Sequence, residues 1–550
     1  MSSEGRAQAP GVSRRPWSAT AGLLLVFVLL ASAWVQSPLL SSGFYADDFL
    51  WLYRIENLPW LEFVLKTHGG HLLHTRNAAF WACHELFGLE PSGYLWAGLL
   101  THVLNVALLF VVIERLTRRP PVAALIAGLW GMAPIHQEAL RWASVHGHVF
   151  AATFVLGTLA DMARLVARRR SPTSWAMVRW SLLLVGAATS FGTGLGVALV
   201  FFAIAWLILP PDSRRGRTAL LFAILTVTLT VVYVFATLTA AINLMNFARE
   251  RSPSLVSVEL NVFKSIPLWS NLVAYGLTTL VLGPLLTWTR EGDVAGPLRG
   301  VELGQALFWA YAVSGMVLLA LVWACRRAGS TRLRQILGFA LLAGCAYGTI
   351  AVARAPLMVV LQVSIPWIAT TARYQYLPQL GLAMALGLAL SEAVARPLSR
   401  SWPSRPRWLV PVALAAVLAM VVPFYAAGAR RVGTQIGAGW RQAVADVVTE
   451  VQRRAHAVPP GAPCYIPNQK FQDWGVVVAP EEEFPGWAAV FVLTHASDSV
   501  DGRRVFFVES NEKLVALLRR NPTARIARLV VTPEEMESGS GVKGRMSAPD

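Results

Sequence analysis

The chain has 550 residues, of which 55% are hydrophobic and only 14% are charged, and its net charge is +17. A soluble globular domain has roughly 25% charged residues, so this composition excludes a soluble globular fold, and the many apolar residues exclude a disordered, coiled-coil or collagen-like chain. Four scattered cysteines exclude a disulfide scaffold. A mean hydropathy of +0.50 and repeated long apolar runs indicate a polytopic α-helical membrane protein.

Twelve apolar stretches have about the length of a bilayer crossing. They lie at 21–36, 92–113, 121–140, 148–166, 177–191, 193–209, 218–240, 267–287, 304–325, 335–353, 374–393 and 408–427. Arginine clusters separate them at 14–15, 115–119, 168–170, 214–217, 326–334 and 396–407, and the positive-inside rule places all of these clusters in the cytoplasm. Successive crossings place the arginine cluster 326–334 in the cytoplasm only if the stretch 267–287 does not cross the membrane. Because prolines and glycines interrupt that stretch, we expect a re-entrant or interfacial helix there and about eleven crossings in total.

This topology puts the N-terminus in the cytoplasm and the C-terminus outside the cell (inner or plasma) membrane. It divides the chain into a cytoplasmic tail (1–20), a transmembrane domain (21–427) with a large first outer loop (37–91), a small extracytoplasmic α/β domain (428–535) and a disordered tail (536–550). The α/β prediction rests on an amphipathic helix at 440–455 followed by β-like runs at 464–467, 474–478, 490–494, 505–508 and 527–531.

The first apolar stretch has two interpretations. Its basic flank, short apolar core and Ala31-Ser32-Ala33 resemble a cleavable signal peptide. The apolar run continues through Trp34 and Val35, which favours an uncleaved membrane anchor. Under both interpretations the following loop lies outside.

That first outer loop opens with two adjacent carboxylates, Asp47 and Asp48, among aromatic residues. Charge at the membrane surface is costly unless it is solvated or used. In a partly dry setting the pKa of a carboxylate rises, and the group can accept a proton from a hydroxyl nucleophile. Neighbouring helical residues point in different directions, so we predict Asp47 as the general base and Asp48 in a supporting role. The alternative is that the pair caps an interfacial helix.

The same loop contains three histidines and Arg76 between positions 68 and 76. In helical geometry His71 and His74 share a face, and such a pair can bind zinc. No second cluster with a known ligand spacing accompanies them, so we predict hydrogen-bonding roles and no metal site.

The second outer loop is far more polar than a passive turn requires, with His136, Glu138, Arg141, His146 and His148. Glu138 and Arg141 are one helical turn apart, so they could form a weak local ion pair. The other interpretation is that this loop forms a second wall of the site.

Arg373 precedes a late crossing, on the face where the positive-inside rule disfavours basic residues. A guanidinium group binds phosphate oxygens bidentately, and Tyr374 and Tyr376 can anchor at the headgroup level. We therefore predict that Arg373 and Tyr374 bind a lipid phosphate. The alternative is a snorkelling arginine within an ordinary aromatic belt.

The order of these motifs resembles the GT-C glycosyltransferases, above all the protein O-mannosyltransferase group and its relatives with tetratricopeptide repeats. The resembling segments are 87–94 (FGLEPSGY), 100–105 (LTHVLN), 134–139 (PIHQEA) with 142–144 (WAS), and 373–378 (RYQYLP). The chain departs from the family at His146-Gly147-His148, where relatives often have a basic-acidic pair, and at 190–194, where they often have a lysine-glutamate hairpin. The repeats are absent.

The resemblance implies an integral membrane glycosyltransferase that moves a sugar from a polyprenyl-phosphate donor to a hydroxyl of a glycan, lipid or protein acceptor at the extracytoplasmic face. Asp47 would deprotonate the acceptor, and Arg373 and Tyr374 would hold the donor phosphate. The site would be lined by Asp48, His71, His74, Arg76, His136, Glu138, Arg141, His146 and His148. The other interpretations are a transporter or flippase of a lipid-linked sugar and an inactive scaffold.

No cofactor is required by this reaction, and a divalent cation bridging the carboxylates to phosphate is an alternative that the sequence leaves open. Nucleic-acid binding is not expected, because the basic residues are spread over separate loops. Cys83 and Cys464 lie on the same side in this topology, and a disulfide between them is an alternative that the sequence leaves open.

Overall fold

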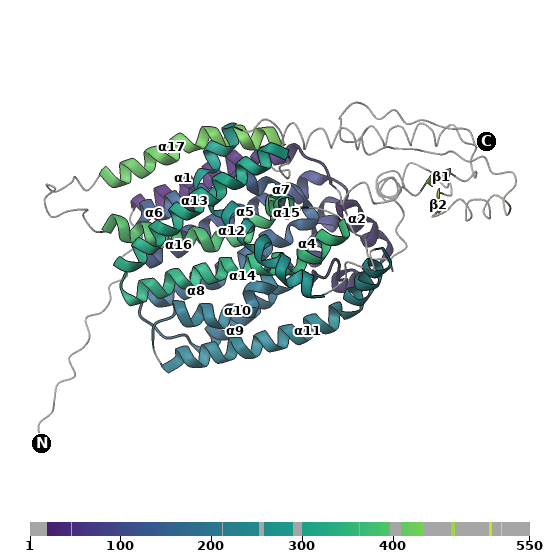
Figure 1. Cartoon of the computed structure of the whole chain (residues 1–550), viewed down its shortest axis with the longest axis horizontal. Helices are drawn as coiled ribbons and strands as arrows, with labels where there is room; N and C mark the ends of the chain where they lie inside the picture. Colours follow the sequence, from purple (N-terminus) through teal and green to yellow (C-terminus); the bar gives the residue numbers. More distant parts are fainter. Residues whose placement is uncertain are drawn as a thin grey trace, which may run out of the picture.

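The computed structural model describes residues 19–45, 47–211, 213–251, 258–289, 300–361, 364–395, 409–433, 464–467, 505–508 and 519. In this part of the chain, long helices pack side by side as a bundle (Figure 1). Nine helices of the described residues are long and apolar enough to cross a membrane. They are α1 (Ala19–Gln36), α5 (Pro91–Thr117), α8 (Gly147–Ala167), α11 (Ser213–Arg251), α12 (Val258–Thr289), α13 (Gly300–Arg327), α14 (Ser330–Leu361), α16 (Tyr376–Ala395) and α17 (Leu409–Arg430). Three shorter apolar helices are α6 (Pro120–Gly131), α9 (Ser174–Ala188) and α10 (Gly192–Ile208).

The protein is therefore a multi-pass helical membrane protein, as its composition predicts, and each predicted apolar stretch overlaps one of these helices. Small residues allow the helices to approach closely. At Gly381 in α16, an added Cβ would lie 2.7 Å from the Phe339 carbonyl oxygen of α14. The predicted number of eleven crossings is not confirmed, since nine helices meet the length and hydropathy criteria within the described ranges.

The arginine clusters of the described residues meet at one end of the bundle, which we call the arginine end. Hydrogen bonds between the loops join them: Arg118 donates to the Ala167 carbonyl (3.4 Å), Arg214 to Pro172 (3.1 Å) and Arg332 to Leu116 (3.0 Å). This shared end is what the positive-inside rule requires of these clusters. Its location in the cytoplasm remains a prediction.

Helix α12 corrects one expectation about the stretch 267–287. It is continuous across the glycines that were expected to break it. These glycines provide room for neighbouring side chains, because a Cβ at Gly276 would collide with the Tyr347 hydroxyl and one at Gly283 would lie 2.7 Å from that of Tyr425. Its residues 265–283 are long and apolar enough to cross a membrane.

The contacts of α12 nevertheless lie away from the arginine end. The Trp269 side chain of α12 donates a hydrogen bond to the Gly344 carbonyl in α14 (2.8 Å), and the Thr278 hydroxyl donates to the Ala310 carbonyl in α13 (3.2 Å). In the first turn of α16, the Gln379 amide donates to the Gly276 carbonyl of α12 (3.0 Å). Since α11 begins and α13 ends at the arginine end, an α12 that does not cross preserves the alternation of sides. The re-entrant interpretation therefore remains our prediction.

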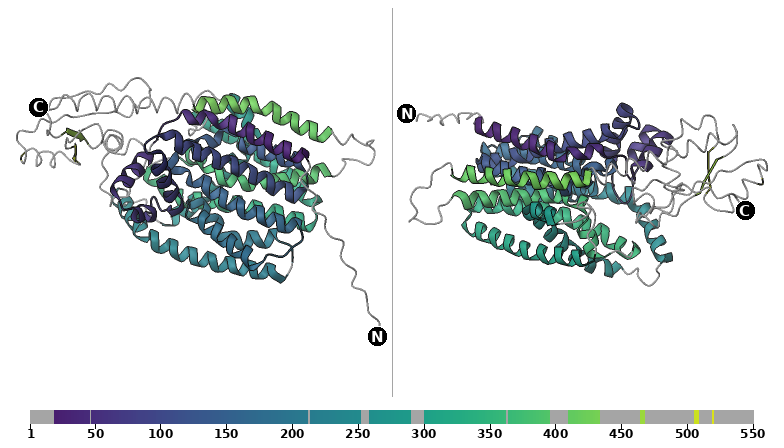
Figure 2. Two further views of the ribbon diagram at one scale, coloured as in Figure 1. Left: turned by 180° about the vertical axis from the view of Figure 1, so that it is seen from behind. Right: turned by 90° about the horizontal axis from the view of Figure 1, so that it is seen from above.

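Short helices of the first outer loop cover the end of the bundle opposite the arginine end (Figure 2). They are η1 (Ser37–Ser41), α2 (Asp47–Asn57), α3 (Trp60–Leu65) and α4 (His74–Phe87). The buried Asn77 fastens α4 to the end of α3, because its amide donates to the carbonyls of Phe63 (3.0 Å), Val64 (3.3 Å) and Lys66 (2.9 Å). Hydrogen bonding of this kind fixes the loop as a folded layer.

The second outer loop forms part of the protein core. It contains η2 (Pro134–His136), α7 (Gln137–Arg141) and η3 (Ala143–Val145), and all residues from 131 to 149 are buried. The short elements α15 (Ile365–Ala369) and η5 (Ala372–Gln375) precede α16. Element η5 packs against α16 and α7, and α15 packs against α12. The polar residues of this loop are thus enclosed by protein.

Only two strands are described in the C-terminal part of the chain. β1 (Cys464–Pro467) pairs in parallel with β2 (Val505–Val508), and both coincide with predicted runs. The remaining predicted elements, at 440–455, 474–478, 490–494 and 527–531, and the tails 1–18 and 536–550 lie outside the described residues, so the α/β domain is not confirmed.

The Cys83–Cys464 disulfide is not supported. Among the cysteines whose side chains are described, Cys83 has a free thiol. Burial raises the pKa of this thiol to about 11, which keeps it protonated.

Candidate active site

The two adjacent carboxylates at the start of α2 have different environments. Asp48 is fully buried. One of its oxygens accepts a hydrogen bond from the Tyr45 N–H (2.9 Å) and the other from the Ser144 N–H of η3 (2.6 Å). Burial raises the pKa of Asp48 to about 7, although these bonds oppose the rise. Asp48 thus joins the first outer loop to the second.

Asp47 is half-buried, and the positive charges of four arginines act on its carboxylate. Burial raises the pKa of Asp47, while the charges of Arg373, Arg76, Arg54 and Arg354 oppose this rise. The arginines come from η5, α4, α2 and α14, so segments that are distant in the sequence meet at one carboxylate. A single acid among several guanidinium groups can accept a proton beside a bound anion.

Arg373 is held by Glu138 of the second outer loop. Its guanidinium forms an ion pair with the Glu138 carboxylate, and its backbone N–H donates to the other carboxylate oxygen at 2.9 Å. The guanidinium carbon also lies 4.9 Å from the ring centre of Trp142 and 5.0 Å from that of Tyr374. The second outer loop and the segment before α16 therefore meet directly.

This contact corrects the local ion pair that helical spacing suggested within α7. Glu138 pairs with Arg373, and the Arg141 guanidinium lies 5.6 Å from the ring centre of Tyr45. Helix α7 is only five residues long, and the carboxylate of its second residue points to η5. Pairing at a distance of 235 residues cannot be read from local spacing.

Arg76 is fully buried and stacks on Trp51, with its guanidinium carbon 3.7 Å from the ring centre. Arg54 lies over the same ring at 4.6 Å. The Nε and one Nη of Arg76 have no hydrogen-bond partner among the described residues. Burial lowers the pKa of Arg76 to about 9, so it is still charged at neutral pH. Its uncompensated N–H groups are suited to an anionic ligand.

Arg354 is a site residue that the sequence analysis missed. Its guanidinium carbon lies 5.4 Å from the ring centre of Tyr374, and its charge acts on Asp47, His71 and His148. Arg354 directly follows the apolar stretch 335–353, so the sequence pattern alone marks it as the end of a crossing. The rule that singled out Arg373, a basic residue at the outer end of a crossing, would have found it.

His71 and His148 enclose Phe191, with ring-centre distances of 4.5 and 4.0 Å. His148 bonds the Thr193 hydroxyl through Nδ1 (3.2 Å), and the Nε2 atoms of both histidines have no partner among the described residues. The Phe191–Thr193 segment lies within 190–194, where the chain departs from the family that its motifs resemble. Two imidazole rings pack against Phe191 at this position.

The expected shared face of His71 and His74 is wrong, because His71 precedes α4 in a turn in which its N–H donates to the His68 carbonyl (3.0 Å). His74 instead contacts the Val64 carbonyl through Nδ1 (3.3 Å). The described residues contain no cluster of three or more potential metal ligands from histidine, cysteine, aspartate and glutamate.

His136 and His146 have contacts typical of core residues. His136 lies within 5 Å of the rings of Trp130 (4.8 Å) and Tyr376 (4.9 Å). His146 bonds the Leu140 carbonyl through Nε2 (2.8 Å). These contacts hold the second outer loop in place, and the site-lining role of both histidines remains a prediction.

Buried neutral histidines make stability depend on pH. Burial lowers the pKa of His71 to about 3 and that of His68 and His136 well below the ordinary 6.5. The unfolded chain then binds more protons than the folded one below about pH 6.5, so these groups stabilise the fold above that pH and the stabilisation is lost as the pH falls. The raised pKa of Asp48 acts in the opposite direction between about pH 4 and 7.

We therefore expect His71→Gln to make stability less sensitive to acid, by about 1.4 kcal/mol per pH unit between roughly pH 6 and 4. The measurement is the free energy of unfolding of the full chain in detergent across this range. Values at pH 8, where the imidazole is neutral in both states, supply the control for lost packing. Equal slopes for the variant and the wild type would contradict the assignment.

No family model matches the sequence, and no curated protein matches it. Among solved structures, the oligosaccharyltransferase AglB of Archaeoglobus fulgidus, in complex with an inhibitory peptide and a dolichol-phosphate, is similar at 12% identity and a TM-score of 0.45, covering 94% of this chain and 70% of that one. ArnT of Cupriavidus metallidurans, bound to undecaprenyl phosphate, is similar at 16% identity and a TM-score of 0.44, covering 94% of this chain and 97% of that one. Likeness at this level does not establish what this chain does.

Proposed function

We propose that the protein is an integral membrane glycosyltransferase that moves a sugar from a polyprenyl-phosphate donor to an acceptor hydroxyl at the extracytoplasmic face. The observation that carries the proposal is the half-buried Asp47 carboxylate, on which the charges of four arginines act. The resemblance of the loop motifs to the GT-C glycosyltransferases, and within them to the protein O-mannosyltransferase group, points to the same chemistry.

In the proposed reaction, Asp47 accepts the proton of the acceptor hydroxyl while the hydroxyl oxygen attacks the anomeric carbon of the sugar. The bond between that carbon and the phosphate oxygen breaks, and its electron pair leaves with the polyprenyl phosphate. Because phosphate is a stable leaving group, one base is sufficient. Hydrolysis of a glycosidic bond, in contrast, uses two carboxylates placed across the bond.

The net positive charge of the site matches the charge of the departing phosphate monoester more closely than that of the donor phosphodiester. Four arginines face the carboxylates of Asp47 and Glu138, which leaves two positive charges, and Asp48, with a pKa near 7, offsets part of one. The donor phosphodiester has one negative charge, and the departing phosphate monoester approaches two. Fixed positive charge that matches the developing anion lowers the barrier.

Individual arginines contribute differently to phosphate binding. Arg373 already has a partner in Glu138, which fixes its position beside Tyr374. Arg76 has unpaired N–H groups, and Arg354 lies beside the same Tyr374 ring, 5.4 Å from its centre. We assign the phosphate to the space between these three. For a transporter or flippase of the same lipid, a carboxylate at this place would only weaken anion binding.

The test is a transfer assay with the purified full chain, synthetic polyprenyl-phosphate hexoses and hydroxyl acceptors. We expect polyprenyl phosphate to be released only when the acceptor is present, and mass spectrometry measures this release. Mass analysis of cell-envelope glycans with and without the gene then identifies the natural sugar. Donor binding without release in any combination, together with unchanged glycans, would favour the transporter or scaffold.

A further inference from the structure

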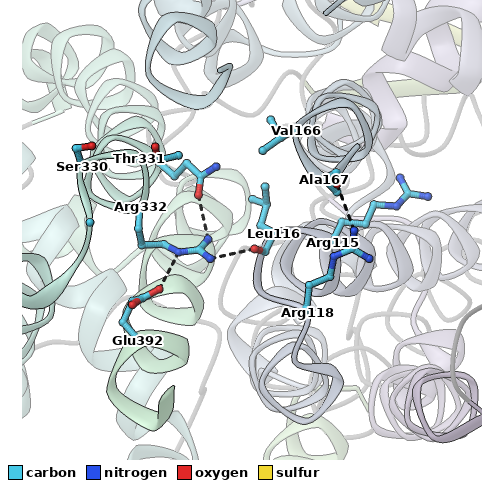
Figure 3. Close-up of a pocket in the computed structure, with 11 residues that line it drawn as sticks. Arg115, Leu116, Arg118, Val166, Ala167, Ser330, Thr331, Arg332 and Glu392 are labelled. Atoms are coloured by element: carbon cyan, nitrogen blue, oxygen red, sulfur yellow. Dashed lines mark hydrogen bonds and ion pairs between the residues drawn. The ribbon is translucent and has the colours of Figure 1, made fainter. Parts of the chain in front are cut away.

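A cavity with charged side chains in its wall lies at the arginine end (Figure 3), whereas Asp47 belongs to the first outer loop at the opposite end of the bundle. Its volume is about 470 Å³, within the roughly 300–1,000 Å³ typical of small-molecule sites. The end of α5, the end of α8, the start of α14 and Glu392 of α16 line it. Nothing in the proposed reaction uses these residues.

One of the lining arginines is part of a fixed scaffold. Arg332 bonds Glu392 through Nε (3.0 Å), Gln335 through Nη1 (2.9 Å) and the Leu116 carbonyl through Nη2 (3.0 Å). Figure 3 shows this side chain extended between α14, α16 and the end of α5. Its charge is balanced by Glu392, so it shapes one wall and contributes little net charge.

The other two arginines leave the cavity positively charged. Arg115 donates to the Ala160 carbonyl (2.8 Å) and Arg118 to the Ala167 carbonyl (3.4 Å). A guanidinium group has five N–H donors, so both retain donors for a ligand. Arg118 is exposed, and no carboxylate besides Glu392 lines the cavity. The cavity therefore has an excess of about two positive charges.

The first turn of α14 adds a second set of donors. Ser330, Thr331 and Arg332 begin this 32-residue helix and line the cavity. The first N–H groups of a helix have no partner inside it, and the helix dipole favours an anion at this end. Together with the exposed hydroxyls of Ser330 and Thr331, this geometry suits the oxygens of a phosphate group.

The depth of the cavity identifies the source of that phosphate. Its lining residues lie where the apolar spans 91–117, 143–167, 330–355 and 372–394 begin or end. Lipid headgroups occupy this level of a bilayer, and basic pockets between helices on the cytoplasmic side bind anionic headgroups. We propose that this cavity binds the phosphate of an anionic phospholipid headgroup, such as phosphatidylglycerol.

The proposal is tested on the full chain in a neutral detergent, titrated with phosphatidylglycerol and followed by native mass spectrometry. The variants are Arg118→Ala and Thr331→Glu, because both side chains are exposed and remote from Asp47. Each removes or opposes a charge-assisted hydrogen bond, so we expect about a tenfold loss of phosphatidylglycerol affinity. The matched control is Arg170→Ala, an exposed arginine at the same end that does not line the cavity.

Two further arms separate the sources of phosphate. Phosphatidylcholine with the same acyl chains tests the preference for an anionic lipid, and inorganic phosphate tests for a soluble ligand. Preferential binding of phosphatidylglycerol that is lost in both variants and kept in Arg170→Ala supports the proposal. Equal affinity for phosphatidylcholine, competition by inorganic phosphate at micromolar concentration, or equal loss in Arg170→Ala would overturn it.

Discussion

Replacement of Asp47 by Asn is expected to lower the kcat of sugar transfer by about 10³-fold, within the 10²- to 10⁴-fold range of general-base catalysis. Asparagine has nearly the same shape but cannot accept the proton of the acceptor hydroxyl. Donor binding should be retained or become tighter, because the substitution removes a negative charge from among four arginines. The measurements are kcat with a polyprenyl-phosphate hexose and the Kd of the same donor.

The matched control is Glu62→Gln, which removes an exposed carboxylate from the same outer loop and should leave kcat unchanged. The wild type should also lose activity in acid as Asp47 becomes protonated, at a pH above the ordinary pKa of 3.8 because burial raises it. A kcat within tenfold of the wild type, or a donor Kd weakened in proportion to kcat, would rule out Asp47 as the base.

Replacement of Asp48 by Ala should destabilise the protein by about 3 kcal/mol. Its carboxylate satisfies the N–H groups of Tyr45 and Ser144 in a place that water does not reach. Each buried donor left without a partner costs roughly 1–3 kcal/mol. The measurement is the free energy of unfolding of the full chain in detergent. Activity should fall as well, because the same bonds hold Asp47 against the second outer loop.

Two comparisons make this prediction specific. Asp48→Asn retains one acceptor oxygen and should lose about half as much stability as Asp48→Ala. Glu85→Ala removes an exposed carboxylate from α4 and should change stability by less than about 0.5 kcal/mol. Equal stability of the wild type and Asp48→Ala would show that the two loops are held together by other contacts.

The helical body could be predicted from the sequence because its determinants are local. Apolar runs set the positions of the crossings, and the arginines of 115–119 and 326–334 mark the end at which they meet. The predicted break in α12 was wrong because the sequence does not distinguish a glycine that ends a helix from one that leaves room for a neighbouring side chain. Only the position of Tyr347 against Gly276 distinguishes them.

The site could be predicted only in part. Asp47, Arg76 and Arg373 stood out because charge near a membrane is rare, and the structure brings them together. The pairing of Glu138 with Arg373 could not be predicted, since it depends on the packing of η5 against α7. The different roles of His71 and His74 depend on where α4 begins, because His74 is its first residue and His71 lies three residues before it.

The Glu138–Arg373 pair also has a consequence for biogenesis. The partners are 235 residues apart, and translation at roughly 5–20 residues per second separates their synthesis by about 10–50 s. During this interval the nascent chain holds an acidic residue of the second outer loop without its counter-ion. Because an unpaired charge is costly once water is excluded, that segment should stay hydrated beside the translocon until the late arginine emerges. The ion pair can therefore form only after η5, which carries Arg373, has been synthesised.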